Sequence, residues 1–97
     1  MVFSPSIPKI KVKNLHGTSD NKSEIWKSWW ELNKGRKFSI CSNIACSKKA
    51  EVGGHVIKAD SSDRSWYIVP LCKECNHTSN NEIMEVRLDD LVRHNNQ

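Results

Sequence analysis

The sequence lacks any long hydrophobic run: no apolar stretch in its 97 residues approaches the length of a membrane-spanning helix. Residues 1–5 also lack the basic region followed by an apolar stretch that marks a secretory signal. We therefore expect a cytoplasmic protein, in which cysteines stay reduced instead of forming a disulfide framework.

Apolar residues are scarce as well. They make up 37% of the chain, which is low for a core that must stabilise a domain by itself. With one tyrosine and two phenylalanines, the sequence leaves much of the core to its four tryptophans. We expect a single small domain in which a bound metal contributes a large share of the stability.

What the chain does have is two close pairs of cysteines, Cys41 with Cys46 and Cys72 with Cys75. Each pair can supply two thiolates from one turn, and the segment between the pairs is long enough for a β-hairpin that brings them together. One alternative is a redox Cys-Lys-Glu-Cys pair, which needs a βαβ context that is absent; another is buried thiols without a ligand. The spacing predicts a structural Zn²⁺ site with all four cysteines as ligands.

The formal charge of +4 is unevenly distributed. Residues 1–40 hold eight Lys or Arg against three Asp or Glu, a net of +5, whereas residues 41–75 carry +1 and residues 76–97 carry −2. Such a basic segment suits an anionic partner such as DNA or RNA, although charge runs are also common on solvated faces. The candidate nucleic-acid contacts near the predicted hairpin are Lys48, Lys49, Lys58 and Arg64.

Two elements are expected before the cysteines. Residues 1–17 are predicted to form a basic arm, with a short edge strand where lysines alternate with apolar residues at 9–13. Residues 21–35 are predicted to form an amphipathic helix that ends at a glycine. Its apolar residues fall in two adjacent stripes, one of Ile25, Trp29 and Leu32 and one of Trp26 and Trp30. The three tryptophans are expected to pack in the core. Any exposed part of this tryptophan face could instead bind a protein partner.

The zinc core is predicted to span residues 38–80. Strands are expected at 51–57 and 66–71, with two glycines in the first strand that indicate a close backbone approach or a bulge. A short helix is expected from the second cysteine pair to Ser79. In the C-terminal extension, 81–97, the stretch 83–92 fits either a strand or a helix, and an extended segment is slightly favoured. Residues 94–97 are expected to fray.

The order of these parts resembles a treble-clef zinc finger, and the residues resemble the zinc-bearing branch of the HNH endonuclease superfamily. The resemblance covers about 41–77 and depends on the two cysteine pairs, His55 and the run at 70–76. The chain also resembles small uncharacterised bacterial and phage proteins that share a Gly-His-Val stretch and a Trp-Tyr-Ile-Val-Pro-Leu-Cys run. That second likeness implies no activity.

The HNH resemblance implies a nuclease mechanism. His55 would be the general base on water, and Asn76 or His77 would hold a second, catalytic divalent cation. Two positions depart from the family pattern. Gly54 precedes the base, where the family has a metal-binding Asp or His, and Tyr67 falls near the position of the asparagine that orients the base. The catalytic set is therefore incomplete, and His55 could instead be a zinc ligand or a strand histidine bonded to backbone.

The expected fold class is α+β: a small treble-clef zinc domain, made of a zinc knuckle, a β-hairpin and a short helix, with an added N-terminal amphipathic helix. The first function predicted is a structural-zinc-binding module that contacts nucleic acid. The alternative is an HNH-like metal-dependent endonuclease with His55 as its base, and a third option is a protein-interaction module. The remaining histidines, His16 and His94, are expected to be surface residues.

Overall fold

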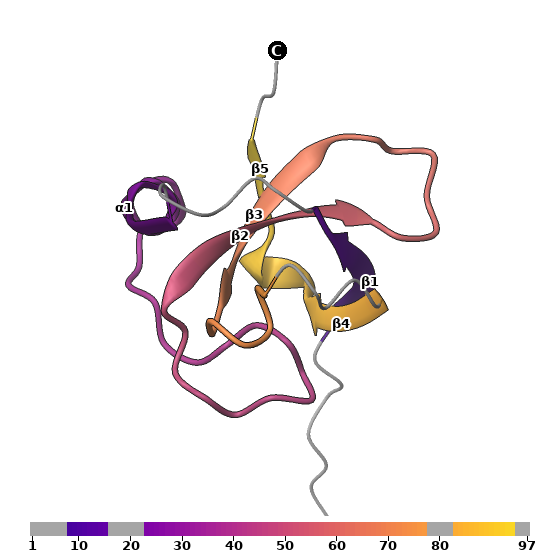
Figure 1. The fold of residues 1–97 in the computed structure, drawn as a ribbon. Helices are drawn as coiled ribbons and strands as arrows, with labels where there is room; N and C mark the ends of the chain where they lie inside the picture. The colour runs from indigo at the N-terminus through magenta and orange to yellow at the C-terminus, as the bar shows by residue number, and fades with distance from the viewer. Residues whose placement is uncertain (1–7, 16–22, 78–82, 95–97) are drawn as a thin grey trace, which may run out of the picture.

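The computed structural model describes residues 8–15, 23–77 and 83–94. Within these ranges the chain is a small α+β domain, in which one α-helix packs against a five-stranded antiparallel sheet. Figure 1 shows the helix, α1 (Ser23–Lys34), on one side of the curved sheet. The predicted helix at 21–35 is confirmed from residue 23 onward, and residues 21 and 22 lie outside the described part. In the described residues, no helix has the length and apolar character needed to span a membrane.

The five strands include segments from both ends of the chain. They are β1 (Lys9–Asn14), β2 (Val52–Lys58), β3 (Trp66–Leu71), β4 (Ile83–Arg87) and β5 (Val92–His94), and they lie in the order β4-β1-β2-β3-β5. Because β1 pairs with both β2 and β4, it is an interior strand, and the prediction of an edge strand at 9–13 was wrong. Its lysines do not prevent pairing, since their side chains project from one exposed face while the strand bonds through its backbone.

The segment predicted as a C-terminal extension supplies both outer strands. β4 pairs with β1, β5 pairs with β3, and a 3₁₀ turn at Leu88–Asp90 joins them. The extended alternative for this segment is therefore the correct one. His94 was expected to fray at the surface, but it pairs with Trp66 and is half-buried, so that prediction was wrong. Residues 95–97 and His16 lie outside the described residues.

The main core lies on one face of the sheet and includes cysteines. Its fully buried aliphatic members are Val12, Val56, Val69, Leu71 and Val86. Cys41 and Cys72 are buried in the same cluster, at 0% and 2% exposure. The cysteine pairs are thus part of the core and do not form a separate appendage.

The helix packs on the other face of β2 and β3 through its tryptophans. Trp30 is fully buried and Trp26 and Trp29 are half-buried, which confirms that the three indoles face the protein interior. Ile25 and Leu32, which share a helical stripe with Trp29, are 60% and 82% exposed. The tryptophans of both apolar stripes therefore face the sheet, whereas the two aliphatic residues face solvent.

Two glycines have conformations or contacts that a side chain would disturb. Gly35 has φ +81° and its N–H bonds to Glu31 O at 3.0 Å, which is the predicted C-terminal cap of α1. Gly53 lies against the helix, where a Cβ would be 2.8 Å from Trp26 Cβ and 3.1 Å from Ile68 Cγ2. The close approach predicted from the glycine pair in β2 is confirmed.

Candidate metal centre

The four cysteines meet in one place. The ligand atoms of Cys41, Cys46, Cys72 and Cys75 all lie within 4.8 Å of one another, and the four thiols are free. The Sγ atoms of Cys46 and Cys72 are 3.8 Å apart. A tetrahedral zinc ion with Zn–S bonds of about 2.3 Å separates its sulfur ligands by about 3.8 Å. The four sulfurs therefore fit a tetrahedral metal ion and are compatible with Zn²⁺.

Local hydrogen bonds shape the first cysteine loop into a tight hairpin. The N–H of Cys41 donates to Lys48 O at 2.8 Å, and the N–H of Cys46 donates to Asn43 O at 2.9 Å. An isolated bridge between Ile40 and Lys49 closes the base of the loop. These bonds turn both sulfurs of the first pair towards the same point.

Cys72 directly follows β3, and Cys75 lies in the turn that comes next. Residues 73–76 form this turn, and the predicted short helix is absent from the described residues up to His77. The N–H of His77 bonds to Glu74 O, three residues back, instead of continuing the i→i−4 pattern of an α-helix. Ser79, where the helix was expected to end, lies outside the described residues.

Polar hydrogens surround the sulfurs. Three N–H groups donate to them at 3.4 Å: Lys48 N to Cys46 Sγ, Cys75 N to Cys72 Sγ, and Asn43 Nδ2 to Cys75 Sγ. Such donors orient thiolates and partly offset the negative charge on sulfur, as outer hydrogen bonds do around metal ligands. A side-chain ion pair between Lys48 and Glu74 also joins the two loops.

The surrounding polypeptide shifts the pKa values of the thiols in different directions. Burial raises the pKa of the Cys41 and Cys75 thiols, whereas the backbone N–H of Lys48 lowers the pKa of Cys46. Gathering several thiolates in this site is therefore unfavourable without a positive charge. A divalent cation supplies that charge, and it binds thiolate rather than thiol.

The candidate nuclease residues do not converge. A Cβ on Gly54 would lie 2.7 Å from Asn76 Oδ1, so Asn76 covers the face of β2 to which Gly54 points. Successive residues of a strand point to opposite faces, and His55 accordingly points to the helix, with its ring 4.7 Å from that of Trp26. His77 is exposed and follows Asn76 in the turn. The strand separates the proposed base from the proposed metal ligands.

The environment of His55 also differs from that of a general base. The residue is 2% exposed. Burial, and to a lesser extent the charge of His94, lower the pKa of His55 to about 4. Tyr67, which falls near the orienting position of the family, donates its hydroxyl to Asp63 Oδ2 at 2.6 Å and does not serve His55.

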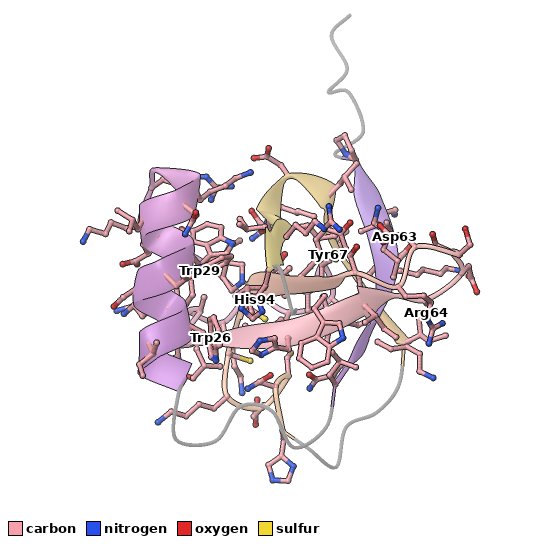
Figure 2. The ribbon with its side chains drawn as sticks, turned by 90° about the horizontal axis from the view of Figure 1, so that it is seen from above. Trp26, Trp29, Asp63, Arg64, Tyr67 and His94 are labelled. Carbon is pink, nitrogen blue, oxygen red and sulfur yellow. The ribbon has the colours of Figure 1, made fainter. Side chains whose placement is uncertain are left out.

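The four predicted nucleic-acid contacts divide into two kinds. Lys48 is paired with Glu74, and Lys58 Nζ lies 3.3 Å from Asp63 Oδ2. Lys49 and Arg64 are exposed, and neither has an ion-pair partner among the described residues. Figure 2 shows Arg64 beside Asp63 near the tip of the β2–β3 loop. Free positive charge is therefore greatest at Lys49 and Arg64 within this set.

Sequence reasoning missed the surroundings of His55. The rings of Trp26, Trp66 and His94 lie 4.7, 5.6 and 5.5 Å from it, between centroids. These residues come from α1, β3 and β5, and no local spacing in the sequence connects them. Only the strand register, which places His94 opposite Trp66, brings them together.

The fold and site thus define a small α+β domain with four clustered cysteines that could hold a metal ion. A scan of family models, a search of curated proteins and a search of solved structures each found no match to the chain.

Proposed function

We propose that this chain is a structural-zinc-binding module with a treble-clef-like zinc core. The observation that carries the proposal is the convergence of four cysteine sulfurs within 4.8 Å. Four thiolates complete a tetrahedron and leave no open position for substrate, as in structural rather than catalytic zinc sites. The zinc holds the Cys41–Cys46 loop against the turn that follows β3.

Metal content tests this proposal. The reduced, full-length protein is expected to contain one zinc per chain. Replacing zinc with Co²⁺ should give thiolate-to-cobalt charge-transfer absorption and the visible bands of a tetrahedral site. Cys75→Ser should lower zinc affinity at least tenfold, while Ser47→Ala, at an exposed position of the first loop, should leave it unchanged. A reduced wild-type protein that contains no zinc and takes up none would overturn the proposal.

We also propose that the module contacts nucleic acid through its basic surface. The support is charge: Lys11 and Lys13 project from the exposed face of β1, and Lys49 and Arg64 have no ion-pair partner among the described residues. Side chains of this kind bind phosphate groups and release counterions. The endonuclease alternative gains no such support, because β2 separates His55 from Asn76.

Salt dependence tests the nucleic-acid proposal. Fluorescence anisotropy with labelled DNA and RNA should show binding that weakens as salt rises. Arg64→Ala and Lys49→Ala should each weaken binding and reduce the salt slope by about one. Lys48→Ala is the matched control and should have a smaller effect, since Lys48 is already paired with Glu74. Absence of binding to either nucleic acid at low salt would remove this proposal and leave the zinc proposal standing.

A further inference from the structure

Five aromatic side chains form a chain of ring contacts where α1 packs on the sheet. The members of this Trp–His cluster are Trp26, Trp29, His55, Trp66 and His94. The rings of His55 and His94 are 5.5 Å apart between centroids, and they lie 4.7 and 4.6 Å from the ring of Trp26. Figure 2 shows Trp26 and Trp29 pointing from the helix towards His94.

Three polar atoms of the cluster are buried without a hydrogen-bond partner: His55 Nδ1, His94 Nδ1 and Trp26 Nε1. Leaving one such atom unsatisfied costs on the order of 1–3 kcal/mol, and native proteins contain few of them. Three such atoms in contacting rings are positions at which a bound ion or water would supply the missing partners. The histidines are held on β2 and β5, both of which pair with β3, so their separation is fixed by the sheet.

The chemistry of the cluster favours a transition-metal ion. Burial favours neutral imidazole, whose unprotonated nitrogen is the commonest metal ligand in proteins. The members contribute no carboxylate, which is the ligand that Mg²⁺ and Ca²⁺ prefer. Imidazole instead suits nickel, copper, zinc and iron.

The imidazole rings of His55 and His94 are close enough for one metal ion to bind both. A metal about 2.1 Å from a ring nitrogen lies about 3.2 Å from the ring centroid, so two imidazoles on one ion have centroids at most about 6.4 Å apart. The observed 5.5 Å satisfies this limit. His94 is half-buried on an outer strand, which provides a path of entry.

We propose that His55 and His94 form a second metal site, which takes a divalent ion of the later first transition row through their two Nδ1 atoms. A water on the ion accepts the hydrogen bond that Trp26 Nε1 donates, so all three buried atoms gain a partner. Two imidazoles hold a metal much less tightly than four thiolates, and the site therefore fills after the cysteines.

The test is a Ni²⁺ titration of the reduced, full-length protein already carrying one zinc per chain. Tryptophan fluorescence and isothermal calorimetry should show saturable uptake of one further ion, with quenching because the ion lies beside Trp26. Zinc content should stay constant and no thiolate-to-nickel absorption should appear, which separates this site from the cysteines. His94→Gln should weaken Ni²⁺ binding at least tenfold.

His77→Gln is the matched control, since His77 is exposed and outside the cluster, and it should bind Ni²⁺ as the wild type does. A measurement on the wild type covers the case in which His94→Gln does not fold: substoichiometric Ni²⁺ should broaden the Nδ1 resonances of His55 and His94 together. The proposal is overturned by any of three results: no saturable uptake, equal binding by His94→Gln and wild type, or a bound water shared by both Nδ1 atoms in protein that takes up no second metal.

Discussion

At the scale of single residues, Asp90 is a buried carboxylate with hydrogen bonds to several elements. It is 2% exposed, and its carboxylate accepts hydrogen bonds from Arg36 at 2.8 Å and Arg87 at 3.0 Å. Its backbone oxygen accepts the indole N–H of Trp30 at 2.8 Å. Arg87 also donates to Ile40 O at 3.1 Å, at the start of the first cysteine loop. One short turn thus connects the helix, β4 and the first cysteine loop.

Asp90→Ala is expected to lower the free energy of unfolding by about 3 kcal/mol, since it leaves partly buried guanidinium groups without their carboxylate. Urea denaturation of the zinc-loaded protein measures this. Asp89→Ala removes the neighbouring carboxylate, which is 82% exposed and paired with Lys34 and Arg36, and should cost under about 1 kcal/mol. Equal losses in the two variants would contradict the role assigned to Asp90.

At the scale of elements, the contact between α1 and β2 depends on the absence of a side chain. A Cβ on Gly53 would lie 2.8 Å from Trp26 Cβ and 2.9 Å from the Trp26 backbone carbon. The backbone carbon cannot turn aside as the end of a flexible side chain can. Any residue larger than glycine here must therefore displace the helix from the sheet.

Gly53→Ala is expected to lower the free energy of unfolding by about 1–3 kcal/mol, the usual cost of overpacking. The comparison is Gly35→Ala, where the added methyl group meets nothing within 4 Å and the cost of about 1 kcal/mol comes from the backbone at φ +81°. Urea unfolding measures both losses. Tryptophan emission should shift in Gly53→Ala alone, because only that variant moves the tryptophan face; unchanged emission would count against the contact.

Much of this architecture could be predicted from the spacing of residues that are close in the sequence. The cysteine pairs, the hairpin between them and the strand at Trp66–Leu71 depend on residues close in the chain, and the structure has them where they were expected. Periodicity could not show which apolar residues of α1 face the sheet, because two adjacent apolar stripes both fit a buried face. The places of β1, β4 and β5, and with them the position of His94, depend on long-range pairing that no local pattern encodes.

At the scale of the whole molecule, the first cysteine loop closes the sheet. The N–H of Ser42 donates to Pro70 O on β3 at 2.8 Å, and the N–H of Arg87 on β4 donates to Ser42 O at 3.3 Å. The N–H of Ile44 adds a bond to Glu85 O, also on β4. Strands β3 and β4 are otherwise separated by β1 and β2 in the strand order. The loop that supplies two of the four clustered cysteines therefore links the two sides of the sheet.

Removing the metal should consequently unfold the whole described domain and not the loop alone. Structural zinc contributes about 10–16 kcal/mol of binding free energy in small zinc-dependent domains, while a small domain is stable by only about 5–15 kcal/mol in total. Hydrogen exchange with and without a chelator distinguishes the outcomes. The amide of Ser42 lies in the first cysteine loop, so it must lose protection whether the loop alone or the whole described domain unfolds. The amide of Leu15, which bonds to His55 O at 2.9 Å between β1 and β2, reports on a strand pair that contains no cysteine. We expect it to lose protection together with Ser42; if Leu15 stays protected after the zinc is removed, the sheet is stable without the metal and the zinc stabilises only its own loops.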